Sequence, residues 1–408
     1  MKIKFLFLIL PALMYADNLK SILEFATSNN KIVNSNVLTQ KAKQKDVESS
    51  QSAYYPTVDI GGSYQRLDDA SPFASGTTYT GYAKISADLY DGGKKSSTIK
   101  QNKALLNASK YDSSAYKKSL QLDIVKDYYN ILSAKSNLNA LQDSNKQLLA
   151  ELDREKKFYA VGTVTKDDVE RLKAAYSNNV YRISSVKYQI ASLKKLLSIK
   201  IGKKITTVDT SSIQTPKELQ QELSDDILAL QEQAHSLAYS AKTIASSYYP
   251  QLRVEDTYNV YGYDDKPKGI KQLNDQNVLM LTLNIRLFDM GEISKQKGSL
   301  MLQKEALEQR IEQYKDTQNI NIELAKLKIE TVISQIQSAK SSLKSSTIAY
   351  ETVAKKYAAG VVDYVTYLDS LSVKTNAKAQ YEKALNDLQI AYASYYYYTN
   401  KNIKDFIK

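Results

Sequence analysis

Two stretches of alternating apolar and polar residues predict β-strands in a chain whose other apolar residues follow a helical period. Each stretch is preceded by a second alternation, which begins at Tyr55 in one case and at Tyr249 in the other. Two β-hairpins are therefore expected, at residues 55–91 and 249–289. The apolar faces of the later strands consist of Gly81, Ala83, Ile85, Ala87 and Leu89, and of Leu279, Leu281, Leu283, Ile285 and Leu287.

Long helices are predicted after both hairpins, because residues 96–159 and 293–357 contain no proline and their apolar residues recur every seven positions. A strict seven-residue repeat favours helices that pack in a left-handed supercoil. The chain is therefore expected to be mainly helical. Shorter helices are expected at about 18–52, at 165–200, at 216–247 and from 364 to the C-terminus.

The chain also repeats itself with a step of 198 residues. The segment LYDGGK at 89–94 returns as LFDMGE at 287–292, and FYAVGTV at 158–164 returns as KYAAGVV at 356–362. Such a repeat predicts two copies of one structural plan. The predicted repeats are 17–215, with hairpin 55–91, a tip turn near 162 and a break at 201–215, and 216–408, with hairpin 249–289 and a tip turn near 360.

Residues 1–16 read MKIKFLFLILPALMYA, in which two lysines flank the start of an apolar run. This pattern is typical of a secretory signal peptide, although a buried N-terminal helix would show a similar run. The chain has no cysteine, and no later segment has 18 consecutive apolar residues, so a membrane contact would use the protein surface or β-strands. The net charge of +12 comes from lysines spread among Asp and Glu, which does not favour nucleic-acid binding.

The predicted hairpins need strands from other chains. Isolated hairpins are only marginally stable, and four strands are too few to close a barrel around a pore. Three copies would supply twelve strands, an even number within the range of outer-membrane barrels. A soluble helical protein with a small β cap is the alternative, but it leaves the apolar strand faces unexplained. Tyrosine suits a membrane–water interface and proline ends a helix, so junctions are predicted at Tyr54, Tyr55, Pro56, Tyr248, Tyr249 and Pro250.

The order of these segments resembles the TolC family of outer-membrane efflux proteins. The resemblance rests on the repeated plan of Tyr-Tyr-Pro, hairpin, Asp-x-Gly and long helix, and on AVGTVTKDDVERLKAAY at 160–176 and AAGVVDYVTYLDSLSVK at 358–374. It implies a mainly α fold with a β-barrel part, in which a homotrimer forms a twelve-stranded barrel in the outer membrane of a Gram-negative bacterium and a long periplasmic α-helical barrel.

The resemblance also implies a function. Such a channel passively conducts drugs, small molecules or proteins in a tripartite efflux or type I secretion system. Its partners are a periplasmic adaptor, an inner-membrane ABC or proton-driven pump, and the surrounding outer-membrane lipid. No cofactor and no metal are expected.

Gly162 and Gly360 each end a full-length helix and predict sharp reversals far from the strands. In the TolC family such turns dock the adaptor, and charged and aromatic residues close the periplasmic mouth. The family's basic position is Val362 here and one acidic position is Thr366, so the usual salt-bridged lock is not expected. Asp369 is either a solvated carboxylate at a helix start or part of a pore ring. By resemblance, docking involves Val161, Gly162, Thr163, Val164, Thr165, Ala359, Gly360, Val361 and Val362, and the constriction involves Asp369, Asp168, Tyr357 and Thr366.

An enzyme is disfavoured by the titratable residues. His235 is the only histidine, and no nucleophile elbow, phosphate-binding glycine loop or metal-ligand spacing accompanies it. A periplasmic coiled-coil adaptor or scaffold would share the seven-residue repeat but has no need of amphipathic strand pairs. It is the alternative function.

Overall fold

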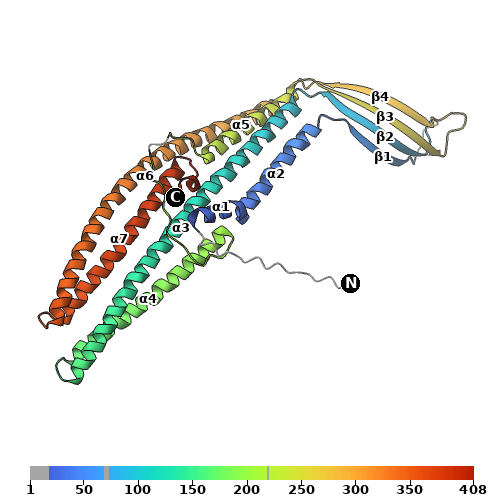
Figure 1. Ribbon diagram of the computed structural model, residues 1–408. Coiled ribbons are helices and arrows are strands. Elements are labelled where there is room, and N and C mark those ends of the chain that lie inside the picture. The colour runs from blue at the N-terminus through green and yellow to red at the C-terminus, as the bar shows by residue number, and fades with distance from the viewer. Residues whose placement is uncertain (1–17, 69–72, 218–219) are drawn as a thin grey trace, which may run out of the picture. The chain divides into compact units, whose positions relative to one another are not determined.

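The computed structural model describes residues 18–68, 73–217 and 220–408, so the signal peptide predicted for residues 1–16 lies outside the described residues. The chain divides into two compact units. The first contains Met1–Ser35, Ser114–Ser224 and Asp316–Lys408, and the second contains Asn36–Ser113 and Asp225–Lys315. The elements in Figure 1 are α1 (Leu19–Asn29), α2 (Lys31–Ser52), β1 (Thr57–Arg66), β2 (Thr77–Tyr90), α3 (Lys94–Ala160), α4 (Lys166–Ile201), α5 (Asp225–Ala245), η1 (Ser246–Tyr248), β3 (Gln251–Asp264), β4 (Asp275–Asn284), α6 (Glu292–Ala358), α7 (Tyr364–Tyr398) and η2 (Ile403–Phe406).

The strands of the second unit form one antiparallel sheet in the order β1-β2-β3-β4. The predicted hairpins are β1–β2 and β3–β4, and β2 joins them by pairing with β3 over nearly its whole length. Strands β1 and β4 are the two edges, so each presents a row of backbone groups that has no strand partner in the described part of this chain. One chain therefore builds an open sheet.

The two faces of this sheet differ in chemistry. Opposite residues in a register share a face, and Val58 lies opposite Ile85 while Val254 lies opposite Leu281. This face is largely apolar and exposed, as Leu281 at 64% shows. Its polar exceptions include Asp256, between Ile85 and Leu279, and Asp264, Asp275 and Asn277. The other face is polar, and includes the opposed pair Asp59 and Lys84. An apolar side and a polar side suit contact with lipid and with water, respectively.

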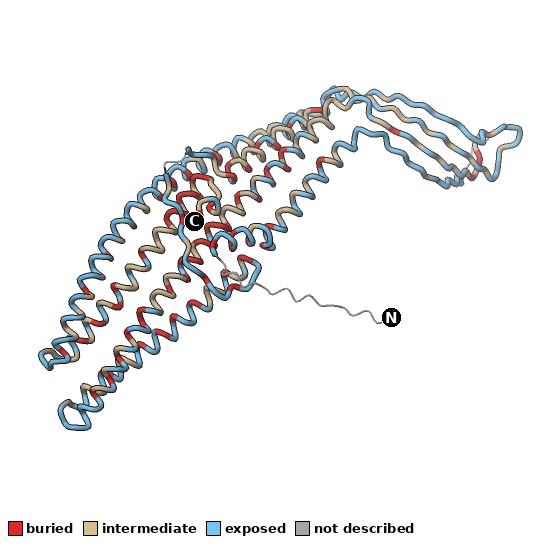
Figure 2. The backbone as a smooth tube through the Cα atoms, in the orientation of Figure 1, coloured by how far each residue is buried: buried red, intermediate tan, exposed pale blue. Residues whose placement is uncertain are grey.

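The first unit contains two pairs of antiparallel helices, α3 with α4 and α6 with α7 (Figure 1). Its largest core cluster includes the fully buried Tyr128 and Tyr129 of α3. Their hydroxyls donate to backbone carbonyls in residues 202–215, which follow α4 and are called the crossing segment. The acceptors are Asp209 and, at 3.0 Å, Ser211. Figure 2 shows the buried residues of this unit along its helices, whereas the strands of the other unit are largely exposed. Within the described ranges, no helix has the length and apolar character that a bilayer span requires.

Two predicted helices differ from the structure at their N-terminal parts. The helix expected at 18–52 is divided at Asn30, whose side chain accepts hydrogen bonds from the N–H groups of Ile32 and Val33 at 2.8 and 3.2 Å and so starts a new helix. The helix expected from Pro216 begins only at Asp225. The backbone N–H of Ser224, just before it, donates to the Gln318 side chain at 3.1 Å, so a tertiary contact holds the residue before the helix.

Two other elements end earlier than expected. Helix α7 stops at Tyr398 and does not reach the C-terminus, because Asn400 adopts a φ of +64° and the chain turns back. The final residues then pack against the crossing segment, where Ile407 forms a β-bridge with Ile213. Strand β4 ends at Asn284, so the predicted strand positions Ile285 and Leu287 lie beyond the sheet.

Candidate functional site

The two helix reversals have the same backbone geometry. Gly162 has a φ of +77° and Gly360 a φ of +73°, in the left-handed region that glycine adopts without strain. At each turn the residue after the glycine donates its N–H to the carbonyl five positions earlier, at 3.0 Å in the first turn and 2.9 Å in the second. This pattern closes the C-terminus of a helix. The side chains of Val161 and Val361 are 72% and 69% exposed, so each tip presents a valine to solvent.

Local caps start the return helices. At α4, Asp168 accepts hydrogen bonds from the N–H and hydroxyl of Thr165 at 3.1 and 2.8 Å, and its own N–H donates to the Thr165 hydroxyl. At α7, Asp363 accepts from the N–H and the hydroxyl of Thr366 at 2.8 and 2.7 Å, and these bonds hold the pKa of Asp363 below its ordinary value. Two of the predicted constriction residues, Asp168 and Thr366, are therefore bonded within the first turn of their own helices.

A buried polar network joins α3 to α6 just before the turns. Glu155 on α3 is only 4% exposed. Its Oε1 accepts a hydrogen bond from the Tyr357 hydroxyl of α6 at 2.8 Å and lies 3.4 Å from a guanidinium nitrogen of Arg154. The guanidinium lies 4.5 Å from the centre of the Tyr357 ring and forms an ion pair with Glu151 at 2.9 Å. Arg154 thus contacts two carboxylates and one aromatic ring.

Burial determines the electrostatics of this network. It raises the pKa of Tyr357, and the hydrogen bond that the phenol donates to Glu155 raises it further, so the hydroxyl keeps its proton. Burial likewise raises the pKa of Glu151, which Arg154 lowers and Glu155 raises. A buried ion pair contributes little net stability when intact, but removal of one member leaves an uncompensated charge. The network therefore fixes one arrangement of α3 against α6.

Aromatic contacts extend this network from α6 to α7. The ring of Tyr357 stacks on Tyr367 of α7, with centroids 4.8 Å apart and planes 20° apart. Tyr367 also meets Tyr350, whose ring centre lies 5.9 Å away and whose hydroxyl lies 3.5 Å from its own. Lys374 then places its ammonium 4.1 Å from the Tyr350 ring centre. The helix pairs α3–α4 and α6–α7 are thus joined near their tips by an apolar and aromatic cluster that includes Leu152 and Leu172.

The structure does not bring the four predicted constriction residues together as one cluster within a chain. Tyr357 is buried in the network, Asp168 and Thr366 cap their helices, and Asp369 is exposed in the second turn of α7. The residues predicted to dock the adaptor lie in the two turns, as their positions in the sequence require.

Sequence analysis missed Glu155 and Arg154, although a signal for Glu155 existed. Ala134, Leu141 and Leu148 occupy every seventh position on α3, and the next such position is Glu155. At the corresponding place in the second repeat, 198 residues later, stands Val353. A carboxylate at an apolar position of a heptad needs a buried partner, and this rule would have singled it out.

The Tyr-Tyr-Pro junctions lie between helix and strand in the second unit. Helix α2 ends at Ser52 and β1 begins at Thr57, while η1 ends at Tyr248 and β3 begins at Gln251. The tyrosines of both junctions are exposed, with Tyr55 the most exposed at 75%. The ammonium of Lys95 lies 5.7 Å from the ring centre of Tyr54. Exposed rings at the base of an apolar sheet face are typical of an interface with lipid headgroups.

A duplicated helical scaffold, in which each long helix follows strands of an open sheet in the chain and is itself followed by a sharp helix reversal, defines a class of channel in which several chains complete one barrel. The family of outer membrane efflux proteins matches residues 22–197 and 218–400, and this chain belongs to that family. The chain is thus an outer-membrane efflux channel with a periplasmic tunnel, and its family is one of transport channels and not of enzymes.

Known relatives are similar to this protein over most of the chain. It is 24% identical to the outer membrane protein TolC of Vibrio cholerae, over 94% of this chain and 92% of that protein. It is 20% identical to TolC of Escherichia coli, over 93% of this chain and 82% of that protein. Its fold is similar to that of the CmeC outer membrane channel of Campylobacter jejuni, with a TM-score of 0.81, 18% identity and coverage of 94% of this chain and 85% of that one.

Proposed function

We propose that three copies of this chain form a channel-tunnel that receives its cargo from an inner-membrane ABC or proton-driven pump through a periplasmic adaptor. The twelve strands of three sheets would complete one barrel, with β1 of each chain paired to β4 of the next. Drugs, small molecules or proteins would pass through it without energy input from this chain.

Unpartnered surfaces support the trimer. The edge strands β1 and β4 each have one row of backbone groups without a strand partner in the described chain. In the first unit, α4 exposes Tyr181 and Tyr188, seven residues apart, at 74% and 77%. Helix α6 exposes Leu324 and Leu327 at 55% and 58%. Apolar stripes on the two outer helices of one chain suit packing of α6 against α4 of a neighbouring chain.

The hydrogen bond from Tyr357 to the buried Glu155 is the observation that carries the gating part of this proposal. It ties α6 to α3, so the helix pair α6–α7 cannot move away from α3–α4 without breaking it. Arg154 reinforces the tie through the Tyr357 ring. The network thus takes the role that Val362 and Thr366 do not supply, and it holds the periplasmic mouth closed at rest. Asp369, exposed on α7, then faces the constriction as a ring of three carboxylates.

Conductance across planar bilayers tests this gate. Tyr357→Phe removes one hydroxyl, and Glu155→Gln removes the negative charge that Arg154 neutralises and to which the hydroxyl donates a hydrogen bond. Both are expected to increase the single-channel conductance several-fold over the unaltered trimer, because each leaves a buried group unpaired in the closed arrangement. Tyr159→Phe is the matched control, since Tyr159 occupies the equivalent position of the first repeat and is 47% exposed.

Unchanged conductance in both variants would refute the gate, and a monomer in detergent would refute the assembly. Asp369→Ala tests separately whether Asp369 lines the constriction, because loss of three carboxylates from a ring lowers the channel's preference for cations. A cation-to-anion permeability ratio equal to that of the unaltered channel would place Asp369 outside the pore.

The exposed tips are the proposed docking surface for the adaptor. Val161→Asp together with Val361→Asp would put charge on both turns without changing their glycines, and pull-down of a periplasmic adaptor that binds the unaltered channel should then fail. Retained binding would move the docking surface away from the tips.

A further inference from the structure

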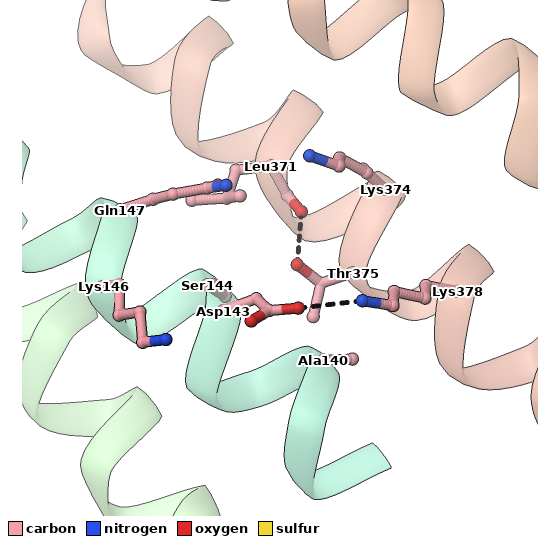
Figure 3. Close-up of a pocket in the computed structure, with 9 residues that line it drawn as sticks. All are labelled: Ala140, Asp143, Ser144, Lys146, Gln147, Leu371, Lys374, Thr375 and Lys378. Atoms are coloured by element: carbon pink, nitrogen blue, oxygen red, sulfur yellow. Dashed lines mark hydrogen bonds and ion pairs between the residues drawn. The ribbon is translucent and has the colours of Figure 1, made fainter. Parts of the chain in front are cut away.

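A pocket of about 250 Å³ lies between α3 and α7 in the first unit, and three lysines line it (Figure 3). Lys146 comes from α3, whereas Lys374 and Lys378 come from α7. The pocket also contains Asp143, which forms an ion pair with Lys378 at 2.8 Å. Three ammonium groups and one carboxylate give the lining a net charge of +2, so the pocket is electropositive.

The three lysines line the same pocket as Asp143. The pKa of Asp143 is lowered first by its hydrogen bond to Lys378, and the charges of Lys378, Lys146 and Lys374 lower it further. The charges of all three lysines therefore act on this part of the pocket. Asp143 pairs with Lys378, and the Lys374 ammonium lies 4.1 Å from the centre of the Tyr350 ring, a contact that does not neutralise its charge, so the lining keeps its net charge of +2.

Uncharged groups in the wall add hydrogen-bonding capacity. The carbonyl oxygen Oε1 of the Gln147 side chain is buried and has no hydrogen-bond partner among the described residues. Rotation of that amide by half a turn would present its NH₂ donors at the same place. Ser144, which is 8% exposed, also lines the pocket. A buried polar atom without a partner costs free energy, and in the rotated form a ligand that accepts a hydrogen bond from the NH₂ group recovers that cost.

We infer that this pocket binds a small organic anion with a doubly charged oxygen group, such as a phosphate ester. A charge of −2 neutralises the lining, and ammonium donors from two helices surround an oxyanion better than they surround a halide. The lining also includes Leu371 and Ala140, whose apolar side chains suit an organic substituent. Because Lys146 and Lys374 lie on different helices, the bound anion stabilises the packing of α3 against α7.

Thermal unfolding and titration calorimetry of the full-length protein in detergent test the site. Inorganic phosphate and phenyl phosphate are the probes, each at constant ionic strength set with chloride. Both should raise the unfolding midpoint in a saturable manner, and phenyl phosphate should bind more tightly. Lys146→Gln and Lys374→Gln should each weaken phenyl phosphate binding about tenfold. Lys187→Gln, which removes an exposed lysine from α4, should leave binding unchanged.

The binding results either support or overturn the proposed anion site. Saturable binding that both pocket variants weaken and Lys187→Gln does not would support the site. No saturable binding of either probe, or equal binding in all three variants, would overturn it. Equal affinity for the two probes would overturn the assignment of an organic anion. The measurement requires no open channel, so it is independent of the proposed gate.

Discussion

The two repeats contribute different chemistry to the contact between their tips, although their turns are the same. In the first repeat α3 supplies Arg154 and Glu155, whereas Thr352 and Val353 stand 198 residues later on α6. In the second repeat Tyr357 is buried at 9% exposure, whereas the equivalent Tyr159 of the first repeat is 47% exposed. The backbone of the tips follows the duplicated plan, but the side chains that join the helix pairs do not.

This difference makes the contact directional. A charged half and an aromatic half pair with each other, whereas two charged halves or two aromatic halves would leave groups without partners. The contact therefore forms between α3–α4 and α6–α7 and specifies which helix pair lies next to which.

The largest expected effect is that of Glu155→Ala. It removes the acceptor of the Tyr357 hydroxyl and one partner of Arg154, at a cost of about 3 kcal/mol to the local opening of α6 near its C-terminus. Hydrogen exchange of amides 350–358 should accelerate by about 100-fold. Val353→Ala, at the equivalent position of the second repeat, removes two carbon atoms from a half-buried site and should cost about 1 kcal/mol. Equal acceleration in the two variants would contradict the asymmetry of the repeats.

The sequence reveals the tip turns and strand pairs because their signals are local. Gly162 and Gly360 stand at the ends of long helical patterns, and the strand faces alternate over a few residues. The contact between Glu155 and Tyr357 joins residues 202 positions apart, so no local pattern contains it. Asp168 shows the same limit, because its carboxylate can cap its own helix or reach across to another one. Packing decides between these, and here it caps α4 with Thr165.

The helix boundaries that differ from their predicted positions also depend on side-chain contacts. Asn30 ends one helix and starts the next because its side chain caps α2, an effect that a periodic pattern of apolar residues does not report. Residues 222–224, just before α5, are held by Gln318, which comes from a distant part of the chain and donates to the Glu222 carbonyl at 2.8 Å. Tertiary hydrogen bonds therefore override a helical preference at that place.

The two tip turns should respond equally to substitution, unlike the side chains that join the helix pairs near the tips. Gly162→Ala and Gly360→Ala each place a Cβ on a residue with positive φ, and no heavy atom beyond the adjacent residues lies within 4 Å of either added Cβ. Each should therefore cost only the backbone strain, about 1 kcal/mol. Gly298→Ala, in α6 without positive φ and also with open space, should instead stabilise by up to about 1 kcal/mol. Thermal unfolding distinguishes these outcomes, and a large difference between the two turns would contradict their equivalence.

The smallest expected effects depend on pH, and they have opposite signs on one helix. Burial raises the pKa of Glu151 above its ordinary 4.5, so the folded protein holds a proton that the unfolded chain has released. Stability should therefore fall as pH rises from about the ordinary value through the raised one, by less than about 1 kcal/mol. Glu151→Gln should remove this decline in thermal unfolding measured across weakly acidic pH.

Asp143 should behave in the opposite way. Its lowered pKa means that its contribution is present above the ordinary value of 3.8 and is lost as pH falls through the lowered one. Asp143→Asn should remove that loss at acidic pH and leave the decline due to Glu151 in place. A single pH dependence shared by both variants would contradict separate roles for the two carboxylates.

The unpaired edges of β1 and β4 have a consequence for cells that produce two versions of this chain. If three chains share one barrel, a chain that folds but has a blocked edge prevents closure of every barrel that it joins. An equal mixture of intact and blocked chains would leave only about one assembly in eight fully intact, since all three members must be intact. Loss of function at a sheet edge would therefore be genetically dominant, whereas loss through failure to fold would be recessive.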